Sequence, residues 1–511
     1  TTADKYVIGL YSIFGANTEM RGGDAYASPR LSDAYSDILK STSWNQYNHN
    51  FNATLLQETA FNSNSAGAFE CWSSHYDRIR RENEFLRDAA EFGRKFGEDW
   101  LKIRIAEVRF CRAYAYFMLC RVYGGVILRT EVDGPEQNDK ARSTEEECWG
   151  FIINELKELA PDLPLKWDSD NSGRATQKAA YGLLSRVALY AEKWDVAAQA
   201  ARDCATAEGN LDLSKNGYAK IFELGINSPE VLFAVEFKSS VIDHAYDAYV
   251  RPSGDTKELG KQVYSGFVPT SELVDSYEMA GDGGNFSWEK HGKDPYANRE
   301  PRFYATILYN GADWMGRKIE SFVGGKDGYK AYENAGAAGT TVTGYYLRKY
   351  LIDGDKTWVT SGSGQDWIVL RYAEVLLNKA EALAMENWNK NSAEALQALN
   401  DVRARVGLPA RATADKETFL EYVRHERKVE LAGEGFRYWD LRRWRLAEKV
   451  IDGQNVHGVK ISKQSDGSFT YEQVDADGGH KRIFYDRYYR FAIPLSERSN
   501  NSLCTNNDGW I

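Results

Sequence analysis

The chain of 511 residues carries 64 Lys and Arg against 74 Asp and Glu, which gives a net charge of −10. Nucleic acids are bound by basic faces, so this balance argues against DNA or RNA as a partner and also disfavours anionic ligands. No apolar run approaches the roughly 18 residues that a membrane-spanning helix needs.

The aromatic content is unusual, because 31 Tyr and 14 Trp accompany only 5 Met. Rings with a polar edge suit a surface that meets a polar ligand with apolar faces, and a sugar is such a ligand. The other rings seal contacts between helices, and we expect this role for more than half of them.

Residues 1–60 are rich in Gly, Asn, Ser and Tyr, and a helical pattern follows. Apolar residues at helical spacing predict helices over 72–86 and 101–123. The second is apolar on most faces, which indicates a helix buried between neighbours. Gly124 and Gly125 end it, since glycine readily takes the left-handed conformation at a helix C-terminus.

A capping box begins the next predicted helix. In this motif a Ser side chain accepts a backbone hydrogen bond three residues on, and an acidic side chain there reaches back. Ser143 followed by Glu146 fits, and the helix is expected to run to about Leu159, where Pro161 and Pro164 close it.

Two helical hairpins stand out further along. Residues 175–191 and 194–206 predict an antiparallel pair of helices, with a tight turn between them. The arrangement recurs where Trp388 precedes a predicted helix over 391–404. The second helix of the first pair holds four alanines, Ala197, Ala198, Ala200 and Ala201. Hairpins with small residues at the crossing are typical of tetratricopeptide repeats.

Residues 210–365 are Gly-rich and irregular, with short strands predicted at 230–237 and 304–309. Helices resume at 366 and end near 450. We therefore predict a mostly α fold, in which tetratricopeptide-like hairpins form a scaffold with a long loop-rich insertion and few short strands. We expect one domain over 1–511, with the scaffold in 70–207 and 366–450 and a ligand face formed by 1–69, 208–365 and 451–511.

An ordered series of motifs resembles the SusD-like (RagB/SusD) family. The series runs from about residue 70 to the C-terminus. Its parts are 106–117 (AEVRFCRAYAYF), 122–125 (VYGG), 174–176 (RAT), 301–306 (PRFYAT), 345–350 (YYLRKY), 370–377 (LRYAEVLL), 426–431 (ERKVEL), 435–443 (GFRYWDLRR) and 492–496 (AIPLS). Each is weak alone, but their order is specific.

The resemblance implies a non-enzymatic, glycan-binding lipoprotein on the outer membrane of Gram-negative bacteria. Such proteins lie on the extracellular face and act as a lid for a SusC-like, TonB-dependent transporter. The family's lipidated N-terminal cysteine is missing here, and we interpret the sequence as beginning after it. A lipid anchor would then be the protein's only attachment to the membrane.

No catalytic or cofactor motif accompanies this resemblance. Glu426 and Glu430 lie one helical turn apart, but neighbouring arginines keep both ionised, so structural ion pairs are expected. His425 has no second His at metal spacing, the six cysteines show no CxxC spacing, and Walker and Rossmann glycine patterns are absent. We expect no cofactor and no metal.

The binding site is predicted in loops that interleave rings with amides. Rings stack on the C–H face of a sugar, while Asn and Gln bind hydroxyls in either direction. Residues 43–51 (SWNQYNHNF) show this pattern best. The candidates are Trp44, Asn45, Tyr47 and Asn48 there, and Tyr264, Trp288, Tyr296 and Trp314 in the insertion. For each ring the alternative is a buried loop anchor. Trp72, Trp388, Trp439 and Trp444 are assigned to the scaffold.

Two other functions remain open from the sequence. Helical toroid glycoside hydrolases also combine helices with many aromatic residues, but they need two functional carboxylates at a cleft. Tetratricopeptide scaffolds bind protein partners, but they usually stack their repeats contiguously.

Overall fold

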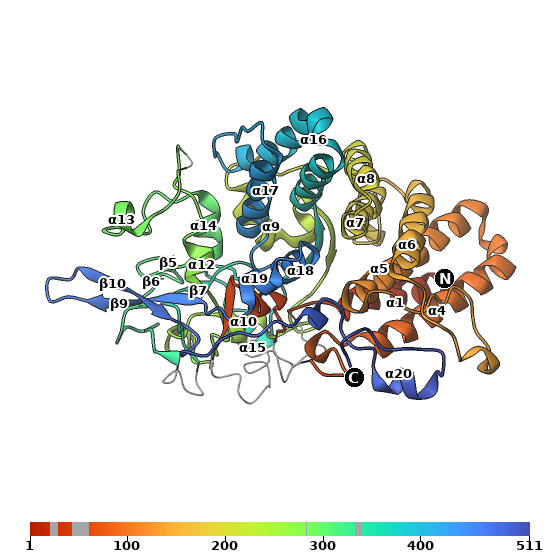
Figure 1. Ribbon diagram of the computed structural model, residues 1–511, viewed down its shortest axis with the longest axis horizontal. Coiled ribbons are helices and arrows are strands. Elements are labelled where there is room, and N and C mark those ends of the chain that lie inside the picture. Colours follow the sequence, from red (N-terminus) through yellow and green to blue (C-terminus); the bar gives the residue numbers. More distant parts are fainter. Residues whose placement is uncertain (21–28, 43–60, 283, 333–338) are drawn as a thin grey trace.

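The computed structural model describes residues 1–20, 29–42, 61–282, 284–332 and 339–511. Its regular secondary structure is mainly helical, and a succession of helices packs each against the next (Figure 1). These are α4 (Trp72–Phe92), α5 (Glu98–Tyr123), α6 (Glu145–Leu159), α7 (Gln177–Tyr190), α8 (Trp194–Thr206), α16 (Tyr372–Arg405) and α17 (Lys416–Glu430). The predicted mostly α scaffold is confirmed.

The predicted hairpin of α7 and α8 is present, and Ala197, Ala198, Ala200 and Ala201 are all buried. Because these side chains are small, the backbones of α7 and α8 approach closely. The second predicted hairpin differs in detail. Its two helices are parts of α16. They are separated at Asn387, whose backbone angles are not helical (φ −163°, ψ 94°).

The start of α6, the helix before α7 and α8, shows that a capping motif can fit two positions that differ by one residue. Its capping box is formed by Thr144 and Glu147, not by Ser143 and Glu146. The Thr144 side chain accepts from the Glu147 N–H at 3.1 Å, and the Glu147 carboxylate accepts from the Thr144 N–H at 2.8 Å. Both registers fit the motif, so the sequence alone does not choose between them. The helix ends at Leu159, as predicted.

The N-terminal region contains helices that the sequence analysis did not predict. These are α1 (Thr2–Leu10) and α2 (Ser12–Gly15), which pack on α5. Smaller helices follow in the insertion and tail: α9 (Gly217–Leu224), α10 (Tyr246–Val250), α11 (Asp255–Leu259), α12 (Ser271–Val274), α13 (Trp288–His291), α14 (Pro301–Thr306), α15 (Trp358–Ser361), α18 (Arg437–Arg443), α19 (Ala447–Ile451) and α20 (Leu495–Asn500).

The strands form antiparallel pairs. They are β1 (Leu39–Ser41) with β3 (Phe267–Pro269), β2 (Val231–Val235) with β8 (Trp367–Arg371), β4 (Ile307–Leu308) with β7 (Tyr346–Leu347), β5 (Asp313–Trp314) with β6 (Arg317–Lys318), and β9 (His457–Lys463) with β10 (Phe469–Asp475).

The strand predicted at 230–237 is therefore confirmed as β2. The strand predicted at 304–309 is mostly wrong, because Pro301 occupies the first turn of a helix that runs to Thr306 and leaves only a two-residue strand. The β9–β10 hairpin lies in a tail that we expected to be irregular.

Contacts between distant parts of the chain close the structure. The Asp33 carboxylate accepts from the Gly433 N–H at 2.8 Å and from the Arg437 N–H at 3.1 Å, across about 400 residues of sequence. The Arg437 guanidinium also binds Asp37 at 2.9 Å. The stretch near the N-terminus that carries Asp33 and Asp37 is thus bound to the start of α18 and to the loop before it. Among the described residues, no helix combines the length and apolar composition that crossing a bilayer requires.

Candidate ligand surfaces

The strongest sequence candidates, Trp44, Asn45, Tyr47 and Asn48, lie outside the described residues. Their segment starts at a defined place. Thr42 follows β1, and its N–H donates to the Gly266 carbonyl at 3.0 Å, beside β3. The last described residue before this segment, Thr42, therefore lies beside Gly266, two residues beyond Tyr264 in sequence.

Tyr264 is half-buried and forms a ring pair with Tyr249 of α10. The two ring centroids are 4.9 Å apart, with an interplanar angle of 38°. The backbone fixes this pair, since the Tyr264 N–H donates to Ala248 at 2.8 Å and the Gly266 N–H donates to Tyr249 at 2.6 Å. Burial, and then the neighbouring Tyr264, raise the pKa of Tyr249.

The backbone of Gly339 packs closely against the backbone of Tyr264. Its φ is +63°, and a Cβ built on it would lie 1.6 Å from the carbonyl oxygen of Tyr264. Only glycine allows this approach. We name Tyr249 and Tyr264 the tyrosine pair. The sequence analysis found one of its two members.

Two further predicted residues come together elsewhere. Trp288 of α13 is half-buried, and its ring lies 5.6 Å from the ring of Tyr471 on β10. Tyr471 in turn lies 6.0 Å from Tyr296, which is only 5% exposed. The Tyr296 hydroxyl donates to the Tyr345 hydroxyl at 3.2 Å. Tyr296 is therefore a fixed, buried ring that contacts more exposed rings such as Tyr471.

Tyr309 and Tyr304 extend this row of rings. The Tyr309 ring lies 5.1 Å from Tyr296 and 5.8 Å from Tyr304. Both Tyr304 and Tyr309 are half-buried. We name the half-buried rings of Trp288, Tyr304, Tyr309 and Tyr471 the Trp288 surface. Three of its four members were not among the sequence candidates.

Trp314 does not belong to either surface, which corrects the expectation of a ligand-contacting ring. It is fully buried, and its indole N–H donates to the Asp255 carboxylate at 3.1 Å. The Arg251 guanidinium lies 5.2 Å from the ring centroid. Trp314 is a loop anchor, because its buried side chain holds β5 against Asp255.

A cavity of about 870 Å³ lies between α1–α2, α4, α5 and β2. Glu19 lines it, and burial together with Asp33 raises the pKa of this carboxyl to about 8. Glu19 and Arg30 flank residues 21–28, which lie outside the described residues.

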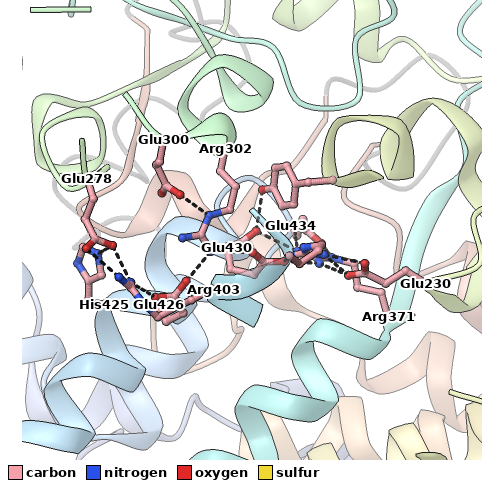
Figure 2. Close-up of polar contacts among 12 residues, drawn as sticks. Glu230, Glu278, Glu300, Arg302, Arg371, Arg403, His425, Glu426, Glu430 and Glu434 are labelled. Atoms are coloured by element: carbon pink, nitrogen blue, oxygen red, sulfur yellow. Dashed lines mark hydrogen bonds and ion pairs between the residues drawn. The ribbon is translucent and has the colours of Figure 1, made fainter. Parts of the chain in front are cut away.

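The charged motif around Glu426 and Glu430 is a buried ion network (Figure 2). Arg302 binds Glu426 at 2.6 Å and Glu430 at 2.8 Å, and Arg403 binds Glu426 at 3.1 Å. Although burial raises the pKa of Glu430, the attraction of Arg405, Arg371 and Arg302 outweighs it and holds that pKa well below its usual range.

Glu430 therefore cannot serve as a proton donor near neutral pH. Both carboxylates are bound by arginines, so the predicted structural ion pairs are confirmed. A glycosidase acid needs the opposite, a raised pKa. Within the described ranges, no group of three or more His, Cys, Asp or Glu side chains could hold a metal ion.

Comparison with known proteins decides the family. The profile described as "SusD family" matches residues 229–510, and a second profile, "Starch-binding associating with outer membrane", matches residues 7–189. The chain belongs to the SusD family. The resemblance seen in the sequence motifs is thus confirmed.

Individual relatives cover most of the chain. A SusD-like protein of Bacteroides ovatus is 26% identical over 83% of this chain and 74% of its own length. The SusD-like protein P38 of Formosa agariphila is 26% identical over 74% of this chain and 73% of its own length. A SusD-like protein of Bacteroides fragilis has a solved structure with a TM-score of 0.85 and 27% identity, covering 99% of this chain and 96% of that one.

Proposed function

We propose that this SusD family member binds oligosaccharides or polysaccharides at the outer face of the outer membrane. It passes them, chemically unchanged, to a SusC-like TonB-dependent transporter. Two structural neighbours support the ligand class. One is named a SusD-like carbohydrate-binding protein of Bacteroides fragilis (24% identical, TM-score 0.80) and the other a laminarin-binding SusD-like protein (21% identical, TM-score 0.71).

The observation that carries the proposal is the tyrosine pair next to the start of the 43–60 segment. Tyr249 and Tyr264 offer two neighbouring rings, and Thr42 is bonded beside them at Gly266. Trp44, Asn45, Tyr47 and Asn48 follow Thr42 closely in sequence. Rings and amides from two distant segments can thus form one sugar-binding platform.

The absence of catalysis is part of the proposal. The carboxylates that could suggest a hydrolase, Glu426 and Glu430, are buried and each is held by arginines. A glycosidase needs two carboxyl groups at an open cleft. If incubation with polysaccharides released new reducing ends, the hydrolase alternative would replace the binding function.

Binding should be weak. A few stacking contacts of about 1 kcal/mol each, with hydrogen bonds that replace those to water, support dissociation constants from micromolar to millimolar, or about 8 to 4 kcal/mol. Weak binding fits delivery, because the ligand must be released into the transporter.

The test is affinity electrophoresis across a panel of polysaccharides with three variants. Trp44→Ala and Tyr264→Ala should each weaken retardation while the melting temperature stays nearly unchanged. Phe92→Ala, which removes an exposed ring from α4, should be retarded like the wild type. A large fall in melting temperature for Trp44→Ala would instead place Trp44 in the core.

The transporter and the lipid anchor are tested separately. A tagged copy extracted from outer membranes of its native host should co-purify with a TonB-dependent barrel. Protease treatment of intact cells should remove it if it lies on the extracellular face. Recovery with soluble peptide ligands and no barrel would favour the tetratricopeptide scaffold alternative.

A further inference from the structure

The Trp288 surface lies apart from the tyrosine pair. Figure 1 shows α13 and the β9–β10 hairpin at one end of the molecule, well away from α10, which carries Tyr249. The rings of the Trp288 surface come from α13, β10 and the stretch from α14 to β4. The two ring surfaces are therefore built from different elements.

The rings of the Trp288 surface are held in place. The Trp288 indole N–H donates to the Asp275 carboxylate at 3.0 Å. Tyr471 is fixed by the β10–β9 ladder, where it pairs with Ile461. The Tyr304 hydroxyl donates to the Tyr296 carbonyl at 2.6 Å and accepts from the Arg299 N–H at 3.2 Å. Fixed rings lose little entropy when a ligand stacks on them.

The middle of the row offers polar groups for a ligand. Within the described part of the chain, the hydroxyls of Tyr309 and Tyr471 have no hydrogen-bond partner. The Asp294 carboxylate is exposed and lies close enough to raise the pKa of both Tyr309 and Tyr471, after the larger effect of their burial. Two phenols and a carboxylate beside fixed rings match the alternating C–H and O–H groups of a sugar.

Charge favours one class of sugar. With a chain charge of −10, the protein as a whole repels sulfated or uronate-rich polymers.

We propose that the Trp288 surface is a second carbohydrate-binding site, specific for neutral, hydroxyl-rich glycans and independent of the tyrosine pair. It rests on the proposed function, since both sites serve one polymer. A chain long enough to reach both surfaces gains avidity without any new contact, whereas a short oligosaccharide fills one surface at a time.

The test uses the full-length protein and four variants on affinity gels of neutral polymers (starch, laminarin, levan, xylan and galactomannan) and of polygalacturonate. Tyr471→Ala and Trp288→Ala remove rings of the Trp288 surface. Tyr471→Phe keeps the ring and removes the hydroxyl, and Phe92→Ala is the matched control at a distant exposed ring. Circular dichroism melting confirms that each variant is folded.

For the neutral polymer that the wild type retains, Tyr471→Ala and Trp288→Ala should each weaken binding about fivefold, the value of one lost stacking contact. Tyr471→Phe should be intermediate, and Phe92→Ala unchanged. An oligosaccharide of two or three sugars, measured by calorimetry on Tyr264→Ala, should still bind and should be lost in the Tyr264→Ala, Tyr471→Ala double variant.

Three results would overturn this inference. If Tyr264→Ala abolishes all binding and Tyr471→Ala changes none, the proposed function stands and the second site does not. If polygalacturonate is retained and Tyr471→Ala releases it, the assignment to neutral glycans is wrong. If the wild type retains no glycan at all, both the second site and the proposed function fail.

Discussion

The buried ion network and the two ring surfaces use opposite physical strategies. In the network, Arg302, Arg371 and Glu430 are withdrawn from water and each charge is bound by others. At the Trp288 surface, the rings of Trp288 and Tyr471 are half-buried, and the Tyr471 hydroxyl has no hydrogen-bond partner among the described residues. Charge density in this molecule thus marks the scaffold, and partly exposed rings mark the proposed ligand face.

The network also explains how the loop-rich insertion is held on the helices. Glu230, Glu278 and Arg302 come from the insertion, whereas Arg371 and Arg403 flank or lie on α16 (Figure 2). A buried charge left without its partner is costly, so each insertion loop is locked to the scaffold by the need for neutralisation. Loops fixed in this way can present rings in a set geometry.

The largest effect should come from breaking the network. Arg371→Ala removes one of the cationic partners of Glu230, Glu430 and Glu434, which it binds at 2.9, 2.7 and 2.7 Å. Loss of one partner of a buried ion pair costs about 3–5 kcal/mol, so urea unfolding should show a fall of this size. An unchanged midpoint would mean that the network contributes little.

Acid should weaken the same network in a definite pH range. Burial raises the pKa of Glu278, but the neighbouring His425 and the hydrogen bonds from Arg403 outweigh it and bring that pKa to about 2. Because the folded pKa lies below the ordinary 4.5, the stabilisation is complete above pH 4.5 and is lost as the pH falls toward 2. The stability of Glu278→Gln, followed by urea titrations at each pH, should depend less on pH in this window than that of the wild type. Equal slopes would contradict this.

Two tyrosines of this row, one buried and one half-buried, should differ in how much their hydroxyls contribute to stability. Tyr296→Phe leaves the buried Tyr345 hydroxyl without its partner and should cost about 1 kcal/mol, whereas Tyr309→Phe removes a hydroxyl with no partner among the described residues and should cost nearly nothing. Thermal melting compares the two directly. Equal costs would show that Tyr309 is as much a part of the interior as Tyr296.

The smallest effect is expected at an exposed ion pair. Lys318 binds Asp313 at 2.6 Å, but their side chains are 65% and 84% exposed. Exposed pairs contribute about 0–1 kcal/mol, so Lys318→Ala should melt like the wild type. A drop comparable to that of Arg371→Ala would remove the distinction between buried and surface charge.

Sequence patterns predicted the scaffold well because its signals are local. The helical periods of α4 to α8, the glycines after Tyr123 and the alanines of α8 each depend on neighbours a few residues away. The β9–β10 hairpin had a usable signal that was missed. Its turn contains Asp466-Gly467, with Gly467 at φ +87°, between stretches of alternating residues.

The ring surfaces could be predicted only in part, because they depend on contacts between distant segments. Trp288 meets Tyr471 only because β10 folds back beside α13. Tyr264 meets Tyr249 through backbone bonds of an irregular loop. Composition indicated that rings would face the ligand, but it could not separate Trp314, which is buried, from Trp288, which is not.

The bonds from Asp33 to Gly433 and Arg437 also constrain the order of folding. They join points about 400 residues apart, and such distant closures are made late because their loop entropy must first be overcome. During synthesis α1, α2 and α4 to α8 can assemble on the emerging chain, but the stretch that carries Asp33 and Asp37 must wait for α18. A truncation before Gly433 should therefore leave a helical core in which the chain around Asp33 is open to protease.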